Sequence, residues 1–181
     1  MRWPDTGLPW VPTSTWITDW ETVQGYPMVG LGCIVGGFTH GIGGPHPFRF
    51  LHNDRVNDAV LARELSALRI PGLLFQPMSA VGAGGRPTTG VYVRITDYNA
   101  WEPTRLNFEL MRLACRIDGR NPFAAATNAQ RRTFMIHVGS AAFFNDLEKN
   151  GARTNIDAWL RTWRQQAQAF QQQSRRYWLY R

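Results

Sequence analysis

The sequence predicts an α+β fold, or a three-layer α/β fold, with a small mixed β-sheet packed by about four helices in a single domain, 1–181. Apolar residues recur at helical spacing between 56 and 68, and again between 156 and 170. Between these regions, residues 91–97 alternate apolar and polar side chains as a half-buried strand does. A chain of 181 residues is long enough to bury one substantial core around such elements.

Composition excludes several classes of protein. A hydrophobic content of 44% with eight Trp excludes a disordered chain. The net charge of +7 suits an anionic partner, but the basic residues are dispersed, so we expect nucleic acid binding to be unlikely. We find neither a signal peptide nor a membrane span, and the sequence leaves the compartment unknown. Cys33 and Cys115 lack ligand or disulfide spacing, which predicts buried free thiols and no metal or cofactor.

The first 27 residues are rich in Pro and Trp, which predicts an extended N-terminal segment, 1–27, held by its aromatic side chains. Residues 18–23 are compatible with a short helix. In that helix Thr18 is the expected N-cap, and Glu21, three residues later, is its capping-box partner.

The stretch 28–50 has seven glycines and almost no charge, and it is the centre of the functional prediction. Residues 31–35 are apolar and predict a buried strand, which feeds a glycine-rich loop. So many glycines indicate that the backbone passes close to something, either a ligand in a pocket or simply another part of the chain in a bulged turn. No phosphate-binding motif is present. The candidate ligand-binding residues here are Gly36, Gly37, Thr39, His40, Gly41, Gly43 and His46.

The middle of the chain alternates helix and strand. A helix over 56–68 is expected to be capped by Asn53 or Asp54 and to end before Pro71. Next come a short strand, 73–75, and a flexible loop, 78–89. The strand 91–97 buries Val91, Val93 and Ile95 and ends on Asp97, which we treat both as a candidate site residue and as an ordinary turn residue.

The C-terminal third is predicted to be mainly helical. Pro103 at a first helical position opens one helix, which Gly119 ends. Residues 134–147 fit either a strand followed by a helix or another arrangement. A C-terminal helix and apolar tail, 155–181, starts at the N-cap Asn155, and its terminal aromatic residues are expected to dock on the sheet.

Five sequence pieces, in this order, resemble the C-terminal half of NamZ-like exo-β-N-acetylmuramidases. The likeness runs from about Trp3 to Tyr180. The pieces are Thr6-Gly7-Leu8-Pro9-Trp10-Val11-Pro12-Thr13-Ser14, Tyr26-Pro27, Gly41-x-Gly43 with Pro47-Phe48, Gly90-Val91-x-Val93-x-Ile95-Thr96-Asp97, and Phe170-x4-Arg175-x-Tyr177-x-Leu179-Tyr180.

The resemblance implies a domain that, in the family, follows a Rossmann-like N-terminal domain and contributes a glycine-rich wall to a sugar cleft. The family's catalytic carboxylate then belongs mostly to the other domain, and no catalytic residue is carried over to this chain. Where the family has Glu, Ser and Arg in the glycine-rich stretch, this sequence has Ile34, Thr39 and Ile42. Because a glycosidase needs paired carboxyl groups, this favours a non-catalytic domain that binds a peptidoglycan-type glycan.

Other readings stay open at this stage. The domain is alternatively the accessory half of a muramidase whose catalytic domain is separate, or a structural subunit of a larger assembly such as a phage particle. A protein partner or homo-oligomer is expected, with Phe38, Trp3 and 177–180 as exposed apolar candidates. His40, His46 and His52 as a metal site, and Ser140 with His137 and Asp146 as a nucleophile set, are disfavoured by their surroundings.

Overall fold

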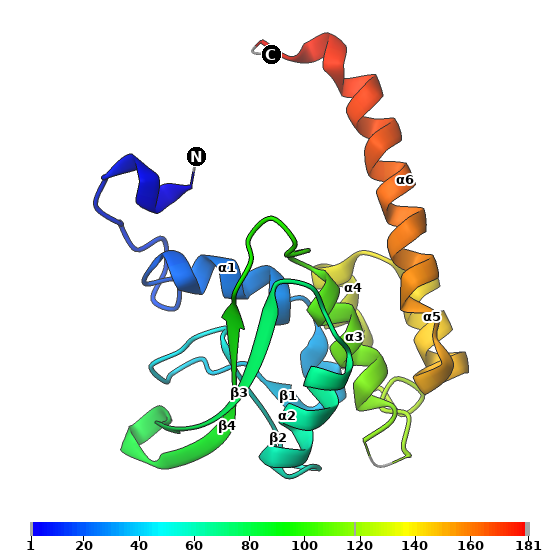
Figure 1. Ribbon diagram of the computed structural model, residues 1–181. Helices are drawn as coiled ribbons and strands as arrows, with labels where there is room; N and C mark the ends of the chain where they lie inside the picture. The colour runs from blue at the N-terminus through cyan, green and yellow to red at the C-terminus, as the bar shows by residue number, and fades with distance from the viewer. Residues whose placement is uncertain (1, 118, 180–181) are drawn as a thin grey trace.

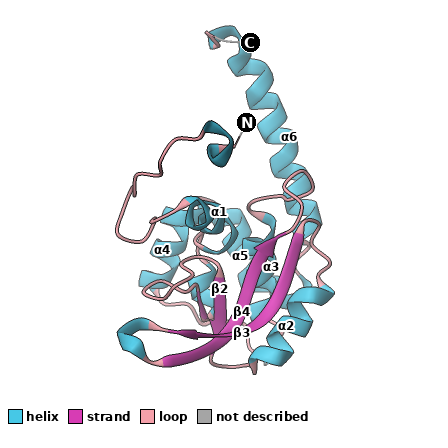
Figure 2. Ribbon diagram, turned by 60° about the vertical axis from the view of Figure 1, so that its left-hand side comes forward, coloured by secondary structure: helices cyan, strands magenta, loops and turns pink. Residues whose placement is uncertain are grey.

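The computed structural model describes residues 2–117 and 119–179, and it has a four-stranded antiparallel sheet with helices packed against it (Figures 1 and 2). The α+β class is confirmed. The strand order is β1-β2-β4-β3, and β3 pairs with β4 over nine residues, from Leu73↔Ile95 to Val81↔Pro87. The strands are β1 (Phe38–Thr39), β2 (Phe50–Asn53), β3 (Leu73–Val81) and β4 (Pro87–Ile95).

The expected mixed sheet is instead antiparallel at every pairing of the described strands. A helix connects β2 to β3, and these two strands run in the same direction, as the alternation of helix and strand predicts. They are not neighbours in the sheet. However, β4 returns from β3 by a tight hairpin and inserts between them. Each neighbour of β4 is therefore antiparallel to it.

The described part of the chain contains six α-helices rather than about four. The difference lies mainly in the region 134–147, where two helices meet. Gly139 ends the first helix with a φ of 71°, and the Ser140 side chain caps the second by accepting a hydrogen bond from the Phe143 N–H. The helices are α1 (Trp20–Val29), α2 (Asp58–Ala67), α3 (Arg105–Ala114), α4 (Asn128–Val138), α5 (Ala141–Asn150) and α6 (Ile156–Ser174).

Several predicted boundaries need correction. Helix α1 occupies the end of the supposedly extended segment, and Asp19, not Thr18, caps it by accepting from the Thr22 N–H at 2.8 Å. Its Pro27 lies inside the helix. The cap of α2 is Asn57, not Asn53 or Asp54. The predicted cap of α6, Asn155, is confirmed.

Two segments adopt a different structure from the one predicted. Residues 33–36 form a 3₁₀ turn between two left-handed glycines, Gly32 and Gly37, so the expected strand over 31–35 is wrong. The predicted flexible loop over 78–89 is largely strand, because β3 and β4 continue almost to the turn that contains Gly84 and Gly85.

The interior consists of two apolar clusters. In the first, Val91, Val93 and Ile95 face helices α2 and α3, as the strand pattern predicted. In the second, rings from α4 and α5, including Phe134 and Phe143, pack with side chains from the start of α6. Cys115 is a buried free thiol in this second cluster, as expected, and the side chain of Cys33 lies outside the described residues.

Helix α6 leaves the body of the protein after its first turns (Figures 1 and 2). Trp159 and Trp163 pack on the second cluster, but Phe170 is 69% exposed. The tail does not dock on the sheet as predicted, since Leu179 is 90% exposed, and Tyr180 lies outside the described residues. The straight helix carries the tail away from the sheet, whose core face α2 and α3 already cover.

The surface differs from the prediction at one further point, because Phe38 is fully buried rather than exposed. In the described residues, no helix is both long and apolar enough to cross a membrane.

Candidate functional site

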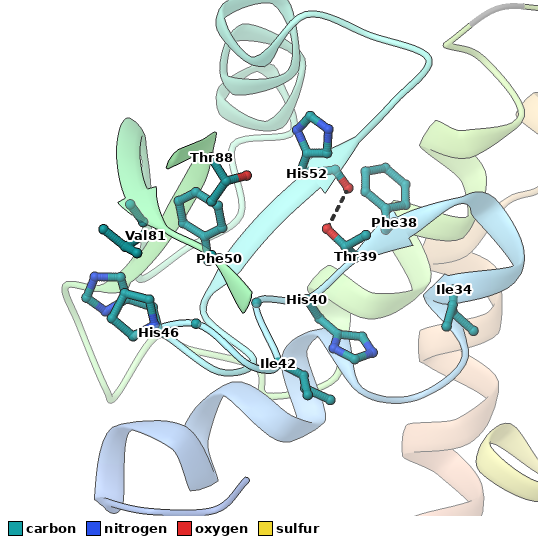
Figure 3. Close-up of a pocket in the computed structure, with 15 residues that line it drawn as sticks. Ile34, Phe38, Thr39, His40, Ile42, His46, Phe50, His52, Val81 and Thr88 are labelled. Atoms are coloured by element: carbon teal, nitrogen blue, oxygen red, sulfur yellow. Dashed lines mark hydrogen bonds between the residues drawn. The ribbon is translucent and has the colours of Figure 1, made fainter. Parts of the chain in front are cut away.

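The glycine-rich stretch forms one wall of a pocket of about 280 Å³, and the end of the β3–β4 hairpin forms the facing wall (Figure 3). By the alternation of the strands, Phe50, Ala80 and Thr88 share the face of the sheet opposite the core residues Leu51 and Val91. In Figure 3 most of the labelled side chains fall into two groups across the pocket, and His46, although it comes from the glycine-rich stretch, lies on the side of the hairpin. Val81, His46, Phe50 and Thr88 form one group, and Ile34, Thr39, His40 and Ile42 form the other.

Glycine shapes the loop where the backbone comes closest to itself. Gly41 has a φ of 73°, and a Cβ there would lie 2.5 Å from the His46 carbonyl oxygen and 2.9 Å from Phe50 Cβ. The loop closes through hydrogen bonds from the Phe48 N–H to the His40 oxygen (2.6 Å) and from the Gly44 N–H to the Gly41 oxygen (3.0 Å). Only glycine fits at position 41 without moving the backbone.

The polar groups of the pocket are hydroxyls and imidazoles. The Thr39 hydroxyl donates to the His52 carbonyl oxygen at 3.4 Å. The ring of His40 stacks on Phe48 with centroids 5.2 Å apart, and its Nδ1 is buried without a hydrogen-bond partner. Burial lowers the pKa of His40, so this imidazole is neutral at physiological pH. Neutral imidazoles and hydroxyls both donate and accept hydrogen bonds, as sugar hydroxyls require.

His52 is held by two carboxylates at the edge of the pocket. Its Nδ1 lies 2.9 Å from Asp58 Oδ1, and its Nε2 lies 3.0 Å from Asp54 Oδ1. Burial lowers the pKa of His52, but the hydrogen bonds and charges of Asp58 and Asp54 outweigh it, and the net pKa is raised. The charge of the protonated His52 side chain is thus compensated by its own neighbours.

The lining contains three histidines but no residue of fixed charge among its described members. Of the pocket residues that the structure describes, none is Asp, Glu, Lys or Arg. Residues 2–117 and 119–179, which the structure describes, contain no group of three or more His, Cys, Asp or Glu placed to hold a metal ion. Most of the wall is apolar, from side chains such as Ile34, Ile42 and Val81.

A family model described as "Exo-beta-N-acetylmuramidase NamZ, C-terminal" matches residues 24–180. The chain belongs to the NamZ C-terminal domain family. The NamZ-like resemblance of the sequence is therefore confirmed, and the match covers every element from α1 to α6 apart from the first residues of α1.

A crystal structure of a DUF1343 family protein from Bacteroides fragilis has the same fold, with a TM-score of 0.84 and 25% sequence identity. The match covers 100% of this chain and 48% of that chain, so this NamZ C-terminal domain spans about half the length of the solved protein. No curated protein matches the chain.

In this NamZ C-terminal domain, Thr39, His40, Gly41 and His46 line the pocket together. The other candidates from the glycine-rich stretch lie beside it. A Cβ on Gly36 would lie 2.5 Å from Ala114 Cβ, so this glycine permits close packing on α3, and Gly37 ends the 3₁₀ turn. Gly43 has a φ of 84° in the turn between the lining residues Ile42 and Gly44.

Asp97 is not at the pocket. It follows the end of β4, whereas Thr88, near the start of that strand, lines the pocket. The Asp97 carboxylate accepts hydrogen bonds from the Asn99 N–H (2.8 Å) and the Ala100 N–H (3.4 Å). It therefore performs the turn function that was considered as the alternative.

The pocket wall contributed by the β3–β4 hairpin was not predicted. Val81, Gly82 and Thr88 come from residues for which the sequence predicts a flexible loop, and Phe50 is the last residue of the stretch 28–50. The available signal is the alternation of residues 91–95 together with the preceding threonines and the glycines of the turn, which is typical of a hairpin.

Two members of the disfavoured nucleophile set, Ser140 and Asp146, have structural roles. Ser140 caps α5, and Asp146 accepts a hydrogen bond from the Trp159 ring nitrogen, which joins α5 to α6. These interactions explain the residues without catalysis.

Proposed function

We propose that this NamZ C-terminal domain is a non-catalytic glycan-binding domain, whose ligand is a saccharide of the peptidoglycan type. The observation that carries the proposal is a pocket formed by the glycine-rich stretch of this chain that is lined, in its described residues, without a carboxylate. The pocket size, its apolar wall and its hydroxyl and imidazole groups support a small neutral or polar organic ligand such as one sugar ring.

The positions of the nearest carboxylates support a binding role rather than catalysis. Glycoside hydrolysis requires two carboxyl groups flanking the scissile bond, one of them able to donate a proton. Asp54 and Asp58 are the carboxylates closest in sequence to the lining residue His52, and both are paired with it. Glu21 instead interacts with Arg49 and Tyr92, outside the lining.

Two assays on the purified chain test the proposal. A chromogenic muramic-acid glycoside measures turnover, and calorimetric titration with soluble peptidoglycan fragments measures binding. We expect binding without turnover. Turnover that disappears in one of the variants Glu21→Gln, Asp54→Asn or Asp97→Asn would overturn the proposal, because the domain would then supply a catalytic carboxyl group itself.

A second candidate function is the accessory half of an exo-β-N-acetylmuramidase. It is favoured by the match of this chain to only 48% of the Bacteroides fragilis protein. In this reading a separate domain supplies the catalytic group, and the pocket described here holds part of the substrate. Restored turnover on mixing with the N-terminal half of a related protein would favour this candidate over the first.

A protein partner or second copy is proposed from the exposed end of the molecule. Phe170, Tyr177, Trp178 and Leu179 are exposed along and beyond α6, and the N-terminal segment lies toward the same end of the molecule (Figures 1 and 2). Exposed aromatic side chains on a projecting helix are typical of an interaction element. This feature also fits a structural subunit of a larger assembly.

A further inference from the structure

We propose that the pocket selects an uncharged N-acetylhexosamine, such as N-acetylglucosamine, over muramic acid, which is the same sugar ring with an added carboxylate. This inference rests on the proposed glycan-binding function and names the ligand class of the same pocket. It follows from the residue types that line the pocket and from the interactions of His52, Arg49 and Arg55 beside it.

The described lining contains no Lys or Arg to pair with a ligand carboxylate. A buried carboxylate needs a positive partner or several hydrogen-bond donors, because leaving water otherwise costs too much free energy. The lining residue His52 already has two carboxylate partners, since its two ring nitrogens face Asp58 and Asp54. Those two carboxylates repel a further anion that approaches His52.

Arg49 and Arg55, at the end of the glycine-rich stretch and just after it, are engaged elsewhere, and Arg86, in the turn of the β3–β4 hairpin, is exposed and does not line the pocket. The Arg49 side chain is almost fully buried, donates to the Val93 carbonyl oxygen at 2.8 Å and forms an ion pair with Glu21. Arg55 donates to the Gly36 oxygen at 2.6 Å and the Ala114 oxygen at 3.4 Å. Neither side chain lines the pocket, so neither is placed to meet a ligand carboxylate there.

The pocket does offer what an acetamido sugar needs. Its volume of about 280 Å³ lies at the lower limit for small-molecule sites, roughly 300 Å³, which suits a single ring. Ile34, Ile42 and Val81 provide apolar surface for a methyl group. The hydroxyls of Thr39 and Thr88 and the neutral imidazole of His40 provide donors and acceptors for the amide and the ring hydroxyls.

Titration of the full chain with N-acetylglucosamine and with N-acetylmuramic acid, followed by NMR at about pH 8, tests the selection. At that pH the added carboxyl group of N-acetylmuramic acid is fully ionised, since carboxyl groups ordinarily have a pKa of about 4. We expect N-acetylglucosamine to bind at least about tenfold more tightly, a difference in dissociation constant that NMR titration resolves. Equal or tighter binding of N-acetylmuramic acid would overturn the inference while leaving glycan binding intact. Binding of neither sugar would overturn both.

Two variants at one position separate charge from shape. Ile42 is partly exposed at the pocket wall, so Ile42→Arg introduces a cation there, whereas Ile42→Gln introduces a polar side chain without charge. We expect Ile42→Arg to raise the affinity for N-acetylmuramic acid by about tenfold or more relative to Ile42→Gln. Affinity for N-acetylglucosamine should be similar in the two variants. An equal response of both sugars to the added charge would contradict the inference.

Discussion

Asp58 Oδ1 lies 2.9 Å from Nδ1 of His52, and this pair joins the first residue of α2 to the pocket edge. Although burial opposes it, the paired carboxylates raise the pKa of His52 above its ordinary value of 6.5. The stabilising interaction is therefore fully present below about pH 6.5 and is lost as pH rises through the higher folded-state pKa.

We therefore expect that removing the Asp58 carboxylate lowers the free energy of unfolding by an amount that depends on pH. Asp58→Asn should lower the free energy of unfolding by about 1–2 kcal/mol near pH 6, and by less near pH 9, because the imidazole of His52 loses its charge as pH rises through its folded-state pKa. Urea unfolding at the two pH values measures this. In a His52→Gln background the cost of Asp58→Asn should no longer depend on pH. A cost that grows toward pH 9 would contradict the assignment.

Gly41 is predicted to be essential for the shape of the pocket. Gly41→Ala should lower the free energy of unfolding by about 2–4 kcal/mol and abolish sugar binding, because the added methyl overlaps the His46 carbonyl and the φ is positive. Gly139→Ala is the matched control, since its φ is 71° and nothing lies within 4 Å of its Cβ position. It should cost about 1–2 kcal/mol and leave binding unchanged.

The proximal and distal parts of α6 should differ sharply in their effect on stability. Trp163 packs on Phe143 and Phe108, with ring centroids 5.2 Å and 4.6 Å away. Trp163→Ala is expected to lower the free energy of unfolding by about 2–4 kcal/mol. Phe170→Ala, on the exposed part of the same helix, should change it by less than about 0.5 kcal/mol. Equal effects in thermal unfolding would contradict this division of the helix.

The periodic elements could be read from the sequence, whereas contacts between distant segments could not. The alternation of Val91, Val93 and Ile95 correctly gave the core face of β4, and Asn155 correctly gave the start of α6. The pocket depends on Thr88 and Val81 lying opposite the glycine-rich loop, which is set by the β2–β4 register. The sequence stretch around Ile34 is apolar enough for a strand, but the flanking glycines adopt left-handed conformations that end any strand there.

The exposed end of α6 should mediate association. From 165 to 179 the chain carries Phe170, Tyr177, Trp178 and Leu179 with two arginines and no acidic residue. Sedimentation at tens of micromolar, about the range where weak interfaces begin to populate, should show a dimer or a complex for the full chain. Deleting 166–181 should yield a monomer with an unchanged melting temperature. A full chain that sediments as a clean monomer would argue against a self-associating surface.

The central claim is that the glycine-rich pocket binds the sugar. Amide chemical shifts of the full chain, followed while an N-acetylglucosamine disaccharide is added, test it residue by residue. We expect saturable shifts at residues that line the pocket, namely Thr39, Gly41, His46, Val81 and Thr88. We expect no shifts at Asp97 or Phe170. Shifts confined to a different surface, such as the hollow between Trp10 and Tyr26, or no saturable shifts at all, would contradict it.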